Sequence, residues 1–591
     1  MSMIARRAVL VTLVLATVSG FALVLGSLLA RDGLTVIEGS MIALLVITMP
    51  WVTAGFWTTV IGMVLLHGTR DWMRYVLPLR GLDDHDTPIY RRTAIVMPVY
   101  NESPERVVRN LRQLGEALAL HSDGDTFDVF LLSDTNKPEI AAREEALFEA
   151  WRRESNLGER LHYRRRADNR RKKAGNIEDF LDRWGEAFDY MVVLDADSIM
   201  APGLVRRLVR LMQVNPKLGI LQATNAGLPT ASAFARIMQF GQRHTMRPQV
   251  VGSSWWQGDC GAYWGHNAII RVDAFRTHCR LPVLPGRAPL GGEIMSHDHV
   301  EAALMHGAGY EVRVLPVESG SYEETPPSLP DYMKRMLRWC QGNMQYSRLL
   351  GLPGLRACGR LHLLFAFLVY LAPPLWYGLV GLGVANALIG DRYIEGGFVF
   401  GAGPALFASA MAIVLMPKLA GLVDVVLRPA TRAAFGGVAK LSSGVLIEIV
   451  FAVLLTPVMA LAQTIFVVGL IFGRGLSWEA QERDARGVSY TEALSRLWPQ
   501  FLLGTSLVLG LGVIEPWLLA WAAPILAGLV LAVPLAVMTS RPAVGRILEH
   551  HGLCAIPEER VVPEELAQLD YRMRQRRVNS IVTSPVLEPF S

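Results

Sequence analysis

The sequence predicts an α-helical transmembrane bundle with a soluble α/β domain inserted between the second and third spans. Three observations predict it. With 51% hydrophobic residues and a mean hydropathy of +0.29, the 591-residue chain is too apolar for a soluble enzyme and too charged for a purely membrane-embedded protein. Long uncharged runs lie on both sides of residues 71–355, which have an ordinary soluble composition. Within that region, apolar strands alternate with more polar helices, as in α/β domains.

Seven apolar runs approach or exceed the roughly 20 residues that cross a bilayer as a helix. Two of them form a predicted hairpin in residues 1–70, and five lie in residues 356–540. Arg6 and Arg7 precede the first run, but the run lacks a small-residue cleavage site, which favours a retained helix over a signal peptide. The runs are residues 8–30, 41–66, 361–390, 399–416, 444–473, 501–522 and 524–539.

Positive residues predict the orientation of these spans. They gather before the first run and after the second, and again in the tail, residues 541–591, at Arg572, Arg574, Arg576 and Arg577. We therefore expect a multi-pass protein of the bacterial inner membrane, with the soluble domain and both termini in the cytoplasm.

Termini on one side require an even number of spans, whereas seven runs are present. Residues 444–473 carry Pro457 at their centre. This run would form either a tight hairpin, giving eight spans, or a re-entrant segment, giving six. The sequence leaves both alternatives open.

The net charge and the spacing of the cysteines exclude some classes of partner and site. The net charge of +5 follows from the positive residues on the cytoplasmic side, so it does not indicate a nucleic-acid partner. None of the five cysteines has CxxC spacing, which predicts a reducing compartment and neither a zinc site nor a disulfide framework. They are Cys260, Cys279, Cys340, Cys358 and Cys554.

The soluble region opens with four predicted strands, residues 94–100, 127–132, 162–166 and 190–194, separated by helical segments. This order is typical of a doubly wound sheet. Neither GxGxxG nor GxxxxGK[ST] occurs, so a dinucleotide-binding fold and a P-loop are not supported. Polar residues follow several of the strands, and ligands bind at the carboxyl ends of strands in such sheets.

The fourth of these strands leads into Asp195 and Asp197. Side chains two residues apart on a strand point to the same side. Two carboxylates there suit a divalent cation such as Mg²⁺ that also holds substrate phosphates. Such a pair can also cap a following helix, so the pattern alone is weak evidence.

Further segments make the chain resemble the processive family-2 glycosyltransferases, which include the cellulose and hyaluronan synthases. Residues 296–299 (SHDH) stand at the place of the family's Thr-Glu-Asp motif, and residues 335–339 (RMLRW) at the place of its Gln-x-x-Arg-Trp motif. Residues 263–271 (YWGHNAIIR) and 338–343 (RWCQGN) resemble more closely the membrane glucosyltransferases of osmoregulated periplasmic glucan synthesis. The resemblance covers most of residues 50–500. Its other parts are residues 97–102 (MPVYNE), Asp134, residues 173–176 (KAGN) and residues 195–197 (DAD).

The resemblance implies an inserted GT-A-type domain that binds UDP-glucose with Mg²⁺ or Mn²⁺. It places Asp197 on the metal, with Asp195 beside it or on the ribose. Asp134 would contact the uracil, and Lys173 and Arg338 the diphosphate. A strand-end turn would explain Asp134 equally well locally. We interpret Lys172 and Arg164–Arg166 as a solvated basic face.

On the acceptor side, the resemblance assigns Asp298 as the general base of an inverting transfer. Its local alternative is a carboxylate at the N-cap or in the first turn of a helix. Trp339, Trp264 and His266 would contact the growing sugar chain, and Trp255, Trp256 and Tyr263 would add to an aromatic loop. Arg338 and Trp339 would also suit a helix at the membrane interface. A metal site from His297, Asp298 and His299 is not expected.

The resemblance implies a β-1,2-linked glucan as the product, which we expect to leave through the helices. Expected partners are UDP-glucose, the β-glucan acceptor and membrane lipid, and the resemblance adds acyl carrier protein and a periplasmic glucan-processing protein. A charged segment near residues 474–499 is a candidate lid or an interfacial helix. Open alternatives are another processive β-glycan synthase, a transferase of single sugars to a lipid, and a non-enzymatic transporter or sensor.

Overall fold

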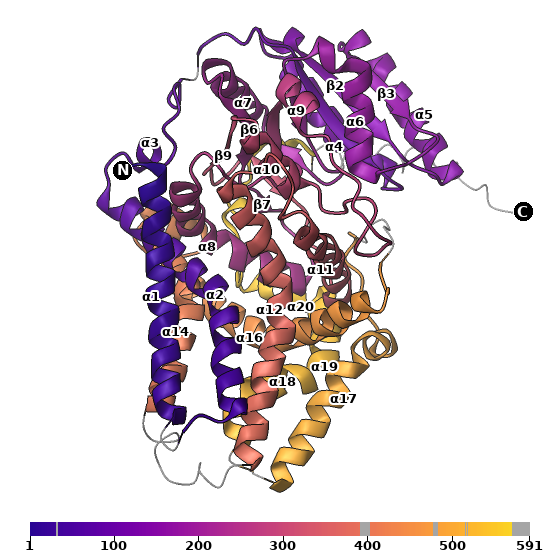
Figure 1. Cartoon of the computed structure of the whole chain (residues 1–591). Coiled ribbons are helices and arrows are strands. Elements are labelled where there is room, and N and C mark those ends of the chain that lie inside the picture. The colour runs from indigo at the N-terminus through magenta and orange to yellow at the C-terminus, as the bar shows by residue number, and fades with distance from the viewer. Residues whose placement is uncertain are drawn as a thin grey trace, which may run out of the picture.

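The computed structural model describes residues 1–30, 33–84, 86–389, 402–476, 483–514, 516 and 518–569. A seven-stranded sheet forms the centre of the soluble domain, in the order β3-β2-β1-β4-β8-β6-β9 (Figure 1). The four expected strands are its first four neighbours, all parallel. The strands are β1 Thr93–Val99, β2 Phe127–Ser133, β3 Leu161–Arg165, β4 Tyr190–Val193, β6 Leu218–Ala223, β8 Ala268–Arg271 and β9 Glu311–Leu315.

The sheet is mixed rather than wholly parallel, because β8 runs antiparallel to both β4 and β6. The completely buried β1 shows how both faces are filled. Ile95, Met97 and Val99 pack into one apolar core, and Ala94 and Val96 pack into the core on the other face. The helices of the domain are α4 Pro104–Ala119, α5 Pro138–Glu154, α6 Lys172–Trp184, α7 Pro202–Val214, α9 Val272–His278, α10 Asp298–Gly307 and α11 Leu329–Met344.

A second, three-stranded sheet lies next to the first, in the order β5-β10-β7. Its strands are short: β5 Ile199–Met200, β7 Ala226–Gly227 and β10 Ser321–Glu323. This sheet ties the segment after the Asp195–Asp197 pair to the segment that leads into α11.

Six helices of the described residues are long and apolar enough to cross a membrane. A seventh run forms a pair of shorter helices, α18 and α19, bent by 52°. These helices are α1 Met3–Leu29, α2 Val36–Gly68, α12 Ala357–Ile389, α14 Ala402–Val426, α16 Val438–Ile471, α17 Tyr490–Ile514, α18 Leu518–Val530 and α19 Ala532–Ser540.

Helix α16 contains most of residues 444–473, for which the sequence left a tight hairpin and a re-entrant segment open. It is one continuous helix with Pro457 inside it, so the tight hairpin is wrong. Near its start, the Gly444 carbonyl lies by Cys554 of the tail, and after its end the backbone N–H of Leu476 donates to Gln341 of α11 at 2.7 Å. Both ends of α16 thus lie on the side of the soluble domain, and 56% of its most apolar stretch is buried against 11–22% for the other candidate spans.

The bent pair returns alongside α17. The backbone at Leu529 of α18 lies against Gly504 in the middle of α17, and the Ser540 hydroxyl at the end of α19 accepts from the N–H of Val488 just before α17. The candidate spans among the described residues are therefore α1, α2, α12, α14, α16 and α17, with the pair α18–α19 as a seventh if it counts as one span. Figure 1 places the N-terminus at the end of α1 that is nearer to the soluble domain.

Helix α8 (Ala233–Gln257) joins the soluble domain to the bundle. It crosses α2 where two glycines meet backbone directly: a Cβ on Gly252 would lie 1.8 Å from the Thr58 carbonyl oxygen, and one on Gly62 would lie 1.9 Å from that of Pro248. The ends of the chain fasten to the same region. Arg7 of α1 pairs with Asp259 at 2.5 Å, and α20 (Pro542–His550) packs against the start of α8.

Candidate functional site

The site residues expected from the sequence line one cavity of roughly 1950 Å³ at the carboxyl ends of β1, β2 and β4. The cavity continues from these strand ends down between the membrane helices. The expected residues on its wall are Asp134, Lys173, Asp195, Asp197, Trp264, His266, Asp298, Arg338 and Trp339.

Asp195 lies at the centre of the cavity's polar end. Lys173, in the first turn of α6, donates to the Asp195 carboxylate and to the Gly265 carbonyl oxygen, the latter at 2.8 Å. Burial opposes ionisation of Asp195, but Lys173 and His266 outweigh it and hold the pKa of this carboxyl below its ordinary value. Asp195 is therefore anionic at neutral pH.

His266 lies beside Asp195 and pairs with Glu323 of β10 at 3.2 Å. Burial alone would lower its pKa, yet the two carboxylates raise the pKa of His266 to about 9. The imidazole is thus a cation at neutral pH. This position on the side of Asp195 differs from the expected role in stacking on the acceptor.

Asp197 is held by Arg483, a residue that follows α16 in the chain. The Arg483 guanidinium pairs with the Asp197 carboxylate and lies 3.5 Å from that of Glu102. Burial raises the pKa of Glu102. Arg483 belongs to the segment expected as a lid; residues 477–482 of that segment lie outside the described residues.

Asp134 is buried at the end of β2, where Arg166 grips it with two hydrogen bonds of 2.7 and 2.6 Å. Two of the four lone-pair positions of the carboxylate remain for a donor on a ligand. Arg164 is also buried and pairs with Asp179 at 3.1 Å. The interpretation of residues 164–166 as a solvated face is therefore wrong for Arg164 and Arg166, while Arg165 is exposed.

Asp298 is the first residue of α10, as the local alternative required, but its side chain does not cap the helix. Within the described part of the chain, its carboxylate forms no hydrogen bond or ion pair. It faces the cavity next to Gly265, and Lys173 also lies beside this glycine. Its neighbours His297 and His299 contact other side chains: His297 pairs with Glu301 at 2.9 Å, and His299 packs edge-on to Tyr346.

Helix α11 places Arg338 and Trp339 on the wall of the cavity. Burial, together with the charge of Arg335, lowers the pKa of Arg338 to about 10, so it stays cationic. Arg335 lies over the Trp339 ring at 4.9 Å, and 41% of Trp339 is exposed. Arg335 therefore covers one face of this indole, and the rest of the side chain contributes to the cavity wall.

The aromatic loop expected around Trp264 is only partly present. Trp264 is 36% exposed and lines the cavity, as does the mostly buried Trp256 of α8. Trp255 and Tyr263 instead pack in apolar cores of the protein. The expectation that these two contact a ligand is therefore wrong.

Below the polar end, the cavity is enclosed by α1, α2, α12, α14, α16 and α18. Its wall there is apolar and rich in aromatic rings that can stack on sugars. These rings are Phe21, Trp51, Phe365, Tyr370, Trp376, Phe407 and Trp521.

The sequence analysis did not identify several charged residues that contribute to the site. Glu102 stands in the motif 97–102, and Arg166 follows β3, so both carried a local signal. Glu323 and Arg483 carried none, because they reach the site only through the folding of distant segments. The carboxylates of Asp195, Asp197 and Glu102 provide the hard oxygen ligands that Mg²⁺ or Mn²⁺ binds, so these residues fit such a metal.

Comparisons with known proteins identify the families that this chain is similar to. The model of "Glycosyl transferase family 2" matches residues 94–279, and that of "Glycosyl transferase family group 2" matches residues 190–420. A mannosyltransferase of Pyrobaculum calidifontis, solved with GDP-Man and Mn²⁺, aligns with 66% of this chain and 98% of its own at 16% identity and a TM-score of 0.42.

Curated relatives are named glucans biosynthesis glucosyltransferase H. The protein of Xanthomonas campestris pv. campestris strain B100 is 35% identical over 92% of this chain and 85% of its own length. Those of Dickeya dadantii and Pseudomonas putida are 37% identical over 92% of this chain, which spans only 65% of their length. The expected combination of a membrane bundle and an inserted GT-A-type domain is confirmed. The chain belongs to glycosyltransferase family 2 and, within it, to the glucans biosynthesis glucosyltransferase H proteins.

Proposed function

We propose that this protein is a hexosyltransferase that moves glucose from UDP-glucose, with inversion, onto a growing β-1,2-linked glucan and exports it for osmoregulated periplasmic glucan synthesis. One observation carries the proposal. The carboxylates and cations suited to a nucleotide sugar share a single cavity with an aromatic-lined passage among the membrane helices. The name of the relatives, glucans biosynthesis glucosyltransferase H, supports glucosyl transfer in glucan biosynthesis.

The donor end of the cavity suits a nucleoside diphosphate sugar. Lys173, His266 and Arg338 would hold the diphosphate, and the two remaining lone-pair positions of Asp134 would accept the N3–H of uracil. Asp195 and Asp197 would hold Mg²⁺ or Mn²⁺, with Glu102 close by. A bound metal ion there neutralises the charge that grows on the departing UDP.

Asp298 acts as the general base in this mechanism. Its carboxylate has no partner among the described residues, and it lies across Gly265 from Lys173 and the donor site. An acceptor hydroxyl between them gives its proton to Asp298 as its oxygen bonds to C1 of glucose and the bond from C1 to the UDP oxygen breaks. Attack from the side opposite the leaving group inverts the configuration at C1.

The acceptor then lies along Trp339 and Trp264 and enters the passage between the helices. Each added glucose would move the chain past Tyr370 and Trp376 toward the far side of the membrane. Arg6 and Arg7, which bind the soluble domain, support a cytoplasmic position for that domain and both chain ends in the bacterial inner membrane.

The test is release of UDP from radiolabelled UDP-glucose by the detergent-solubilised protein with Mg²⁺, with and without acyl carrier protein and native lipid. Linkage analysis of the product follows on the same samples. Metal-dependent turnover with 2-linked glucose supports the proposal. Other linkages would assign another processive synthase, and a single sugar on a lipid would reject the polymerase. No turnover under any of these conditions would favour a transporter or sensor.

A further inference from the structure

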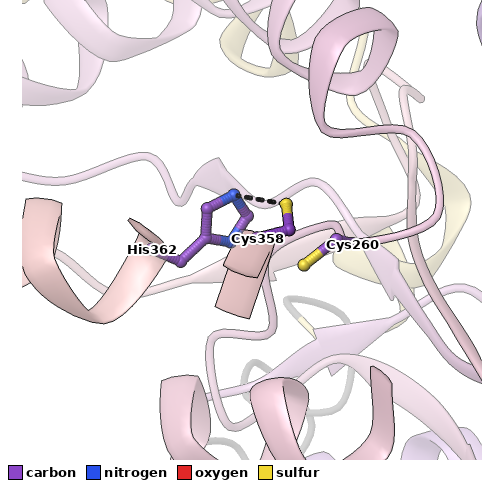
Figure 2. A group of neighbouring side chains, drawn as sticks. All are labelled: Cys260, Cys358 and His362. Carbon is purple, nitrogen blue, oxygen red and sulfur yellow. Dashed lines mark hydrogen bonds between the residues drawn. The ribbon is translucent and has the colours of Figure 1, made fainter. Parts of the chain in front are cut away.

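Three potential metal ligands that are far apart in the sequence lie together where α8, β9 and α12 meet. The Sγ atoms of Cys260 and Cys358 and a ring nitrogen of His362 all lie within 4.8 Å of one another. The Cys358 Sγ is 4.0 Å from the His362 Nε2, along the dashed line in Figure 2. The expectation that the cysteines form no zinc site rested on sequence spacing alone, which does not show this contact.

The backbone fixes all three positions. Cys358 and His362 are four residues apart near the start of α12, so one helix face presents both. Cys260 comes from a separate segment, held to β9 by a bridge to Val312 and by the N–H of Gly261, which donates to the Val312 carbonyl oxygen at 2.6 Å. Both cysteines are buried, and a thiolate at Cys358 lies at the positive end of the α12 dipole.

The ligand set selects a thiophilic metal. Zinc binds sulfur at about 2.3 Å and histidine nitrogen at about 2.0 Å, so tetrahedral ligands lie roughly 3.5–3.8 Å apart. The observed separations, 4.8 Å or less, exceed these values by at most about 1.3 Å, which side-chain rotations can close. Two sulfurs and one imidazole do not suit Mg²⁺ or Ca²⁺, which prefer oxygen.

We propose that Cys260, Cys358 and His362 bind one Zn²⁺ ion, with the fourth position open to a water molecule on the side of the central cavity. His362 lines that cavity, and Trp256 packs edge-on against its ring at 5.6 Å. The ion fastens the loop after α8 to the first turns of α12, and so the catalytic domain to the third membrane helix. Arg7 binds the same loop at Asp259, which brings α1 into the joint.

The test measures zinc by mass spectrometry in full-length protein purified in detergent under reducing conditions. We expect about one zinc ion per chain in the unmodified protein, and loss of most of it in Cys358→Ser and His362→Ala. Cys554→Ser is the matched control, because this buried thiol lies away from the cluster, near the Gly444 carbonyl, and its loss should leave the zinc content unchanged.

Two further measurements separate a specific site from other outcomes. Cobalt in place of zinc should give a thiolate-to-metal absorption band that disappears in Cys260→Ser. Added zinc should slow alkylation of two cysteines in the native protein, and a chelator should restore it. Unmodified, reduced protein that takes up no zinc when zinc is added would overturn the proposal, as would equal zinc loss in Cys554→Ser or a Cys260–Cys358 disulfide in place of the metal.

Discussion

Arg483 should compete with the catalytic metal, and Arg483→Gln tests this directly. The guanidinium pairs with Asp197, the proposed metal ligand, and lies 3.5 Å from Glu102 with only 11% of its side chain exposed. A cation that binds Asp197 must therefore displace another cation first. The substitution removes the positive charge, and with it that competition, and leaves a shorter polar side chain.

The size of the effect follows from the contact. A hydrogen bond between charged groups is worth about 1.5–3 kcal/mol. Each 1.4 kcal/mol is a factor of ten in affinity, so Arg483→Gln should bind Mn²⁺ about 10- to 150-fold more tightly in the absence of sugar nucleotide. Electron paramagnetic resonance of free Mn²⁺ during titration measures the dissociation constant.

Arg486→Gln is the control, because Arg486 pairs with Glu492, on the side of the segment away from Asp197. Its Mn²⁺ affinity should equal that of the unmodified protein. The reasoning is refuted if Arg483→Gln leaves the affinity unchanged or weakens it while Asp197→Asn abolishes binding. In that case Asp197 binds the metal, but Arg483 does not oppose it.

Three other perturbations follow from the structure. Asp298→Asn should lower kcat by about 10²- to 10⁴-fold while isothermal titration finds UDP-glucose affinity unchanged, since the carboxylate acts only on the acceptor proton; weakened donor binding would contradict this role. The charged His266 contributes on the order of 3 kcal/mol to the free energy of unfolding, because folding raises its pKa. This contribution is full below the unfolded pKa near 6.5 and is lost as the pH rises through the folded pKa of about 9. The thermal unfolding midpoint should fall over that window, and His266→Asn should flatten the fall. Gly252→Ala should destabilise the protein by about 1–3 kcal/mol or more, because its Cβ would meet the Thr58 carbonyl at 1.8 Å. Gly55→Ala, with open space around it, should unfold at the same temperature as the unmodified protein.

The sequence predicted those parts of the fold that depend on local patterns. Strands β1, β2, β3 and β4 are apolar or alternating runs that end in turn residues, and the structure has each within one or two residues of its expected bounds. Their polar ends meet at one edge because parallel strands share a direction, so the gathering of Asp134 and Asp195 followed from topology.

The partners of those carboxylates could not be predicted in the same way. Arg483 and Glu323 reach the site through segments folded back from far along the chain, and no local pattern marks them. The number of spans could not be predicted for a related reason. A helix buried beneath a domain and a helix that crosses a bilayer both need an apolar surface, so composition cannot tell them apart.

The docking of the tail has a consequence for how the protein is made. Glu558 and Glu559 pair with Arg243 and Arg236 of α8, at 3.0 and 2.6 Å, and both arginines are buried. These acids leave the ribosome after the last apolar helix, whereas α8 precedes α12, α14, α16 and α17. Until Glu559 is synthesised, Arg236 lacks its acidic partner, and the contact between the tail and α8 is incomplete and open to cellular proteases. Chains that end before residue 558 would therefore insert in the membrane with these two arginines lacking their tail partners. The resulting loss of stability would make such chains more susceptible to degradation.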